Sequence, residues 1–198
     1  MPFKPNQREY RAIEITNFKP SEEEDSYIVE GYATTFNDPY ELYPGYMEVI
    51  DRHALDNADM TDVIFQFDHA GTPMARIRNN TLSLFLDEHG LLVKADLGGC
   101  QRGRELHEAI KSGLVDRMSW GFTIDEDGWE YDRETKTSTI TRVAKVYDVS
   151  AVSLPANEGT EIKARSYLDG VIEGEGQELP KCEEDGERKR LALVLQTL

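Results

Sequence analysis

Cysteine, long apolar runs and basic residues are all scarce in this 198-residue chain. Its two cysteines, Cys100 and Cys182, lie far apart and form no Cys-x-x-Cys pair, which argues against a disulfide framework or a zinc ribbon. No apolar run approaches the roughly 18 residues that a membrane-spanning helix needs, and the N-terminus lacks the apolar segment of a signal peptide. These absences predict a soluble, cytoplasmic protein without a membrane partner.

The shortage of basic residues leaves a strong negative charge. There are 22 Lys and Arg against 38 Asp and Glu, a formal net charge of −16. Nucleic-acid phosphates and anionic lipid surfaces attract the opposite sign, so we expect neither as a partner. Hydrophobic residues make up 39% of the chain, which is enough for one globular core at this length.

What the sequence does contain is a series of short strand-like segments, rich in β-branched and aromatic residues and interrupted by Gly, Pro and Asp. We expect strands over 10–18, 27–36, 46–50, 62–69, 81–87, 91–97, 116–124 and, in two or three pieces, 128–154. Residues 101–113 have an apolar face at helical spacing and a terminal glycine, which predicts a helix. The pattern is typical of a mostly β protein with helices (α+β) and a barrel-like antiparallel sheet.

Two connecting segments and the C-terminus lack this pattern. Residues 37–46 carry Pro and Gly and are predicted to form a loop, whereas residues 51–58 resemble one or two helical turns with Asp51 as N-cap. Residues 170–198 begin with a Gly- and Glu-rich stretch, typical of a flexible acidic linker, and end in the apolar sequence RLALVLQTL. We therefore expect one folded domain over 1–169, followed by a linker and an apolar tail.

The candidate chemistry centres on Ser119, which lies in an apolar strand-like run. A serine hydroxyl needs a base before it acts as a nucleophile. The chain offers four histidines as that base, His53, His69, His89 and His107. His69 differs from the others because it ends an apolar strand, where a side chain can project from a rigid edge into a cleft. A purely structural role is the alternative for His69.

A serine–histidine pair usually needs an acceptor that holds the imidazole in one tautomer. Asp148 is enclosed by apolar strand residues, and a buried carboxylate needs a partner such as a histidine N–H. An arginine partner, or an exposed place on an edge strand, is the alternative. Asp68 is the weaker candidate because neighbours on a strand point to opposite faces. The chain has no Gly-x-Ser-x-Gly elbow, P-loop ending or metal-ligand spacing, so we expect no cofactor and no metal.

Three segments of the chain together resemble a known family. FQFDHAGTPMARI, RGRELHEAIKSGLVDRMSWGF and VYDVSAVSLPANEGTEI are similar, in this order, to the prohead maturation proteases of tailed bacteriophages. The stretch from VEGYATTFNDP to YMEVIDRHAL is similar to that family's N-terminal strand and following loop, so the resemblance covers roughly residues 8–167. These phage enzymes resemble the herpesvirus assemblins, which implies an antiparallel β-barrel surrounded by a few α-helices.

The resemblance also assigns roles to residues. The family's histidine falls on His69, its serine nucleophile on Ser119, and its third member, usually a glutamate, on Asp148. Backbone N–H groups at Trp120 and Gly121, or in the loop PANEGTE, would stabilise the oxyanion. The resemblance therefore implies a serine endopeptidase with a Ser-His-Asp triad.

The biological setting follows from the same resemblance. The enzyme would act inside the assembling procapsid in the bacterial host cytoplasm, and would cut a scaffold protein or the scaffolding extension of the major capsid protein. It would also cut itself, for which the accessible chain after residue 170 is a suitable place. A dimer is the expected oligomer, and the tail RLALVLQTL would dock the enzyme in the shell. The alternatives are a non-catalytic β-barrel capsid-assembly protein (a degenerate protease) and a serine hydrolase of small esters.

Overall fold

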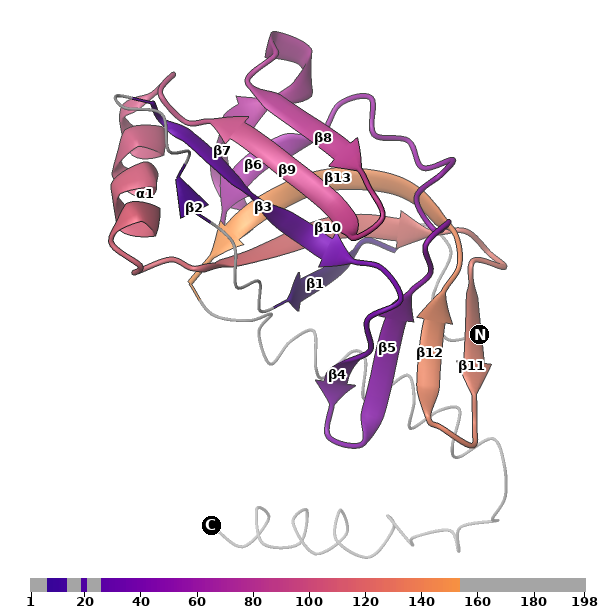
Figure 1. The fold of residues 1–198 in the computed structure, drawn as a ribbon. Helices are drawn as coiled ribbons and strands as arrows, with labels where there is room; N and C mark the ends of the chain where they lie inside the picture. The colour runs from indigo at the N-terminus through magenta and orange to yellow at the C-terminus, as the bar shows by residue number, and fades with distance from the viewer. Residues whose placement is uncertain (1–6, 14–18, 21–25, 154–198) are drawn as a thin grey trace, which may run out of the picture.

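The computed structural model describes residues 7–13, 19–20 and 26–153 (Figure 1). Its elements are β1 (Glu9–Ile13), β2 (Lys19–Pro20), β3 (Ile28–Thr35), β4 (Tyr40–Tyr43), β5 (Tyr46–Ile50), β6 (Ile64–Phe67), β7 (Ala70–Arg76), the 3-10 turn η1 (Ile77–Asn79), β8 (Leu82–Leu86), β9 (Gly90–Asp96), α1 (Gln101–Lys111), β10 (Arg117–Ile124), β11 (Trp129–Asp132), β12 (Thr137–Ile140) and β13 (Val143–Val152). The predicted linker and apolar tail over 170–198 lie outside the described residues.

The strands form three sheets. A five-stranded sheet has the order β1-β10-β13-β6-β7, and two four-stranded sheets have the orders β2-β3-β9-β8 and β11-β12-β5-β4. In Figure 1 strands β3, β9 and β8 cross in front of β10 and β13, while β4, β5, β11 and β12 extend away from this body. Mostly β structure with a helix is therefore confirmed. Hydrogen bonds between the described strands do not close these sheets into a barrel. The described residues form one α-helix, α1. The predicted barrel with several helices is therefore not confirmed.

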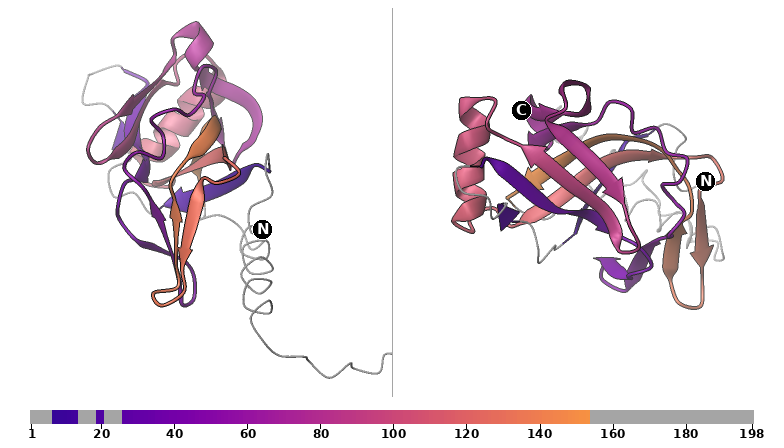
Figure 2. Two further views of the ribbon diagram at one scale, coloured as in Figure 1. Left: turned by 90° about the vertical axis from the view of Figure 1, so that its right-hand side faces the viewer. Right: turned by 45° about the horizontal axis from the view of Figure 1, so that its top comes forward.

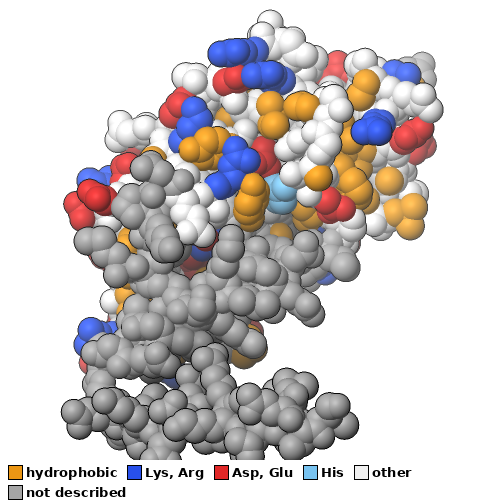
Figure 3. All heavy atoms as spheres, turned by 180° about the vertical axis from the view of Figure 1, so that it is seen from behind, with side chains coloured by type: hydrophobic (Ala, Val, Ile, Leu, Met, Phe, Trp, Pro, Cys, Tyr) orange, Lys and Arg blue, Asp and Glu red, His pale blue; other side chains and the backbone are white. Residues whose placement is uncertain are grey.

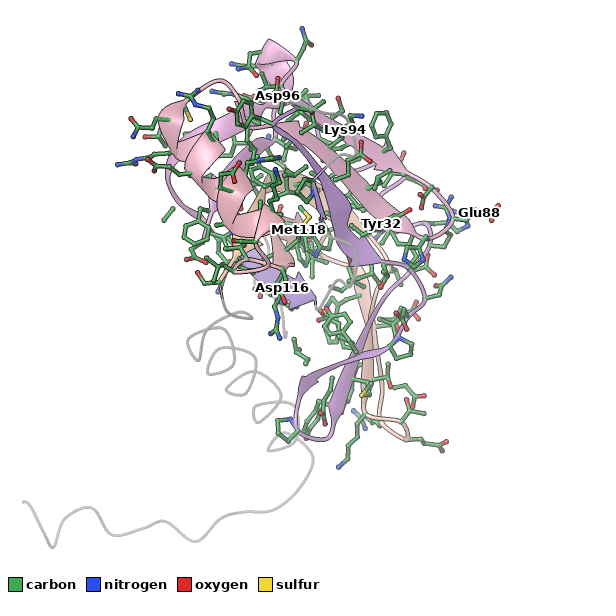
Figure 4. All side chains as sticks on the ribbon, turned by 60° about the vertical axis from the view of Figure 1, so that its left-hand side comes forward. Tyr32, Glu88, Lys94, Asp96, Asp116 and Met118 are labelled. Atoms are coloured by element: carbon green, nitrogen blue, oxygen red, sulfur yellow. The ribbon has the colours of Figure 1, made fainter. Side chains whose placement is uncertain are left out.

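The core lies between the five-stranded sheet and the sheet of β3 and β9. Strand β10 supplies its largest side chain, Trp120, whose ring stacks on Phe122 at a centroid distance of 3.9 Å. Residues two apart on a strand share a face, which brings these rings together with Met118. Figure 4 shows Met118 in the interior and Asp116, just before the strand, at the surface. The apolar residues around Ser119 thus serve as core, as the sequence pattern indicates.

Helix α1 matches the prediction for 101–113 closely. Its N-cap Cys100 accepts a hydrogen bond from the Gly103 backbone N–H, and Leu106 and Ile110 form its buried face. The helix ends just before Gly113, whose φ of +74° is the left-handed conformation that glycine tolerates best. The right-hand view of Figure 2 shows the helix at one end of the sheets, away from the β4–β5 and β11–β12 hairpins.

Two segments differ from the sequence prediction. Residues 51–58 form consecutive turns rather than a helix, although Asp51 does accept a hydrogen bond from the His53 backbone N–H, as an N-cap would. Residues 37–46, predicted as a loop, contain β4, which is antiparallel to β5. The turn between them passes through Gly45, whose φ is +84°. The glycine therefore lies in the turn of a β-hairpin rather than in a long loop.

A buried ion pair ties β1 to the sheet that contains β4 and β5. Arg11 on β1 donates to Glu48 on β5 through Nε at 2.5 Å and Nη2 at 3.1 Å, and the Tyr40 hydroxyl on β4 donates to the same carboxylate. Burial lowers the pKa of Arg11, but the Glu48 carboxylate, with Tyr40 and Glu9, outweighs it and holds the pKa above its ordinary value. Burial also raises the pKa of Tyr40, which therefore stays a neutral donor. This network fixes where β1 lies.

Candidate active site

Ser119 lies at the centre of β10, the second strand of the five-stranded sheet. Its pairing partners are Ala12 on β1 and Ser150 on β13. Because side chains alternate along the strand, Ser119 projects from the face opposite the stacked Trp120 and Phe122 rings. Its side chain is only 1% exposed. The nucleophile candidate thus sits on a rigid, fully paired strand rather than on a loop.

The sequence predicted that His69 ends a strand. It lies instead in the turn between β6 and β7. Phe67 pairs with Ala70, so Asp68 and His69 alone make the connection. Both residues have positive φ, +49° and +53°. A two-residue hairpin turn with positive φ at both positions ordinarily favours Asn-Gly or Asp-Gly, so a histidine at the second position is under backbone strain. Such strain is typical of functional positions.

Asp148 lies on β13, next to β10, and is 1% exposed. Its Oδ1 accepts hydrogen bonds from His69 Nδ1 and, at 3.1 Å, from the Ser150 hydroxyl. Its Oδ2 accepts no hydrogen bond from the described residues, but the Arg8 guanidinium lies 3.6 Å away. Both partners that the sequence left open for Asp148, a histidine and an arginine, are therefore present.

The structure brings the three predicted residues together. His69 Nε2 lies 2.6 Å from Ser119 Oγ, while its other nitrogen faces Asp148. An ionised carboxylate only accepts hydrogen bonds, so Nδ1 carries the imidazole proton and Nε2 is left as the acceptor for the serine hydroxyl. Asp148 and Ser119 are buried and His69 is 19% exposed, so the imidazole is the part of the group that solvent reaches.

The other three histidines have partners elsewhere. His53 is exposed and pairs with Asp56, whereas His89 packs edge-on against Tyr32 and His107 against Tyr27. None of these contacts includes Ser119. Asp68, the weaker acid candidate, binds Ser153 instead of an imidazole. Of the alternatives that the sequence left open, the structure assembles His69 and Asp148 around the serine.

Gly121 explains how Asp148 reaches the histidine. It pairs directly with Asp148 across the two strands, so both lie on the same face of the sheet. A Cβ added at Gly121 would lie 2.5 Å from Asp148 Oδ2 and 2.9 Å from the Tyr10 ring. The glycine therefore makes room for a carboxylate and an aromatic ring. Trp120 and Gly121, the predicted oxyanion donors, lie where β10 is paired on both sides, with β1 and β13.

Strand β1 also contributes to the site, which the sequence did not indicate. The Tyr10 ring packs on the His69 ring at a centroid distance of 4.5 Å. The Arg11 carbonyl oxygen lies 2.9 Å from Ser119 Oγ, as a second acceptor for the one hydroxyl proton. Arg8 stacks on Tyr147 at 4.0 Å while it faces Asp148. These residues lie 59 or more positions from the residues they contact, so no local sequence pattern predicts the contacts.

The surface and the rest of the described chain add three observations. Figure 3 shows, on the back of the molecule, hydrophobic side chains interspersed with charges of both signs. The described residues hold no group of three or more His, Cys, Asp or Glu placed to bind a metal ion. Between residues 7 and 153, no helix among those described has the length and apolar character needed to cross a membrane.

A buried serine hydroxyl, an imidazole and a carboxylate, hydrogen-bonded in that order, are the arrangement that serine hydrolases use. The comparison with known families agrees with this class. The model of the caudovirus prohead serine proteases matches residues 14–170, and the chain belongs to this family of capsid-maturation serine peptidases. Searches of curated proteins and of solved structures found no match. Strand β1, with its contacts to the site, precedes the matched residues.

Proposed function

We propose that Ser119, His69 and Asp148 form the catalytic triad of a capsid-maturation endopeptidase. Ser119 Oγ attacks the scissile carbonyl carbon while His69 Nε2 takes the hydroxyl proton. The same nitrogen then protonates the leaving amine, the C–N bond breaks, and an acyl-enzyme forms on Ser119. Water, deprotonated by His69, releases the acid product and restores the serine. Asp148 holds the imidazole tautomer and stabilises the imidazolium that forms in each half-reaction.

One observation carries this proposal. The imidazole of His69 bridges the two buried partners, with Nε2 at 2.6 Å from Ser119 Oγ and Nδ1 on Asp148 Oδ1. A nucleophile, its base and the base's orienting group within hydrogen-bond reach are the signature of an activated serine. Asp148 replaces the glutamate usual in the family, and Gly121 lets this shorter acid approach.

The oxyanion donors have two proposed sources. Backbone N–H groups at Trp120 and Gly121 lie in the plane of a sheet paired on both sides, so a donor there must leave its strand partner or share its proton with the oxyanion. The loop PANEGTE, the other source, lies outside the described residues. A loop donor requires no such change in the sheet.

Family membership makes capsid proteins the general substrate class. We propose more narrowly that the enzyme cuts a scaffold protein or the scaffolding extension of the major capsid protein inside the procapsid. Cleavage of its own chain after residue 170, and dimerisation, complete the proposal. The rival is a degenerate protease that only binds capsid subunits, for which the assembled Ser119–His69 pair has no use.

The test compares the wild-type chain with Ser119→Ala by intact mass after co-expression with the capsid protein. We expect shortened capsid protein and shortened enzyme only with the wild type. Ser112→Ala is the control, because this serine lies at the end of α1 and its hydroxyl donates to the Ala109 carbonyl. It should cut as the wild type does. Equal cleavage by Ser119→Ala, or none by any of the three chains, would contradict the proposal.

A further inference from the structure

The turn that carries His69 has a strained backbone, so contacts with other parts of the chain must stabilise its conformation. Residues 68 and 69 both adopt positive φ, in a connection only two residues long. Neither is glycine, and a left-handed conformation is unfavourable for a residue with a Cβ. A relaxed turn would swing the imidazole away from Ser119, because the backbone dihedrals of His69 set the direction of its Cα–Cβ bond.

Asp68 supplies the contact that holds the turn. Its Oδ1 accepts a hydrogen bond from the Ser153 backbone N–H at 2.9 Å, and its Oδ2 accepts one from the Ser153 hydroxyl at 2.8 Å. Its own N–H donates to the Ala151 carbonyl at 2.9 Å. The turn is therefore bonded to the end of β13 from both its backbone and its side chain. Strand β13 also carries Asp148, so base and acid share one support.

Another hairpin aspartate in the described chain, Asp132, acts differently. It accepts hydrogen bonds from the backbone N–H groups of Glu134 and Thr135, two and three residues further along its own turn. Asp68 instead bonds a residue 85 positions away. The Asp132 carboxylate shapes a local turn, whereas the Asp68 carboxylate sets the position of its turn relative to another strand.

We propose that Asp68 is a positioning residue, which keeps the His69 imidazole between Asp148 and Ser119 by tying the strained turn to Ser153. The inference rests on the proposed role of His69 as the base. It assigns Asp68 no contact with substrate. Its effect is on how often the imidazole lies within reach of the hydroxyl.

Three variants of the full chain separate the tie from the backbone strain. Asp68→Gly relieves the cost of positive φ but removes both acceptors. Asp68→Asn tolerates positive φ, accepts from the Ser153 N–H through Oδ1, and donates to the Ser153 hydroxyl through Nδ2. Asp132→Gly makes the same chemical change in a hairpin that does not contact the triad, and serves as the control.

The readout is the rate of reaction with an alkyl fluorophosphonate, divided by the fraction of chain labelled at completion. In this reaction Ser119 Oγ bonds to phosphorus, the P–F bond breaks, fluoride leaves and His69 takes the hydroxyl proton. The normalised rate counts only folded, competent molecules, so a loss of stability alone does not change it. We expect Asp68→Gly to fall about 100-fold, as a misplacement of about 1 Å would cause. Asp68→Asn should stay within about threefold of wild type, and Asp132→Gly should equal it.

The outcomes distinguish this inference from the proposed function. If Asp68→Gly reacts at the wild-type rate, or Asp68→Asn falls as far as Asp68→Gly, the inference is wrong while the triad stands. If the wild type is not labelled at Ser119, or Ser119→Ala is labelled as fast as the wild type, the proposed function itself is wrong. Rescue by asparagine, with the control unchanged, supports a positioning role.

Discussion

Gly121→Ala tests the geometry of the site through one added methyl group. Gly121 has an ordinary extended backbone, so alanine meets no conformational obstacle there and should even suit a strand slightly better. The new Cβ would lie 2.5 Å from Asp148 Oδ2, 3.2 Å from Asp148 Cγ and 2.9 Å from Tyr10 Cε1. All of the expected damage therefore comes from contact with residues of the site.

The size of the effect follows from those distances. Ordinary contact begins at 3.4 Å, so the Asp148 carboxylate must withdraw by about 0.9 Å. It is buried and hydrogen-bonded to His69 and Ser150, so it cannot move without disturbing the imidazole. A displacement of about 1 Å at a catalytic group costs about 100-fold in rate. Overpacking of a buried site costs about 1–3 kcal/mol, which at this chain length lowers the Tm by about 2–12 °C.

The assay combines thermal unfolding with the normalised rate of fluorophosphonate labelling at Ser119. Gly99→Ala is the matched control, because a Cβ added there has no heavy atom within 4 Å. We expect the control to retain the wild-type rate and Tm. A wild-type labelling rate in Gly121→Ala would refute the view that this glycine positions Asp148. A lower Tm with an unchanged rate would mean that the Tyr10 ring alone gives way.

Two further predictions concern stability. Arg11→Met leaves Glu48 buried without its cation, so the free energy of unfolding in urea should fall by about 3–5 kcal/mol, and replacing both residues by Met should cost clearly less; a loss as large in the double variant would contradict this. A hydrogen bond from Tyr32 lowers the pKa of Asp87, so its charge stabilises the fold above the unfolded pKa of about 3.9 and ceases to do so as the pH falls through the folded pKa. The Tm advantage of wild type over Asp87→Asn should thus be steady from pH 7 to 5 and shrink below about pH 4; an advantage that grew on acidification would be inconsistent with that sign. Figure 4 shows Tyr32 on β3, and its hydrogen bond with Asp87 is only partly buried, so solvent screening keeps the effect small.

Local patterns in the sequence predict most of the strands and the helix, because each depends on a short alternation of apolar and polar residues. Three strands escape this reading for the same reason. Strand β2 ends in Pro20, β4 lies between Pro39 and Pro44, and β7 contains Pro73. A sheet accepts these prolines because all three strands lie at sheet edges. A proline argues against a central strand and says little about an edge, and which strands are edges depends on the tertiary fold.

The candidate site likewise contains residues that local sequence predicts and residues that only the tertiary fold brings into place. Asp148 is recognisable as a carboxylate in need of a partner, because it is enclosed by apolar residues in a strand. The turn at His69 is not recognisable from the sequence. A two-residue hairpin turn usually has the sequence Asn-Gly or Asp-Gly, whereas this one is Asp-His. The roles of Tyr10 and Arg8 depend on β1 pairing with β10, a contact between segments more than a hundred positions apart. Such pairings arise from the fold as a whole.

The pairing of the first strand with β10 has a consequence for the timing of synthesis. Ser119 bonds a carbonyl 108 residues earlier in the chain, and His69 bonds an acid 79 residues later. Contacts between such distant segments form slowly, because much of the chain must be closed into a loop before they contribute. A nascent chain on the ribosome holds its nucleophile strand without its acid until residue 148 has emerged. The proposed triad therefore cannot form before that point of synthesis, because it requires β13 paired beside β10.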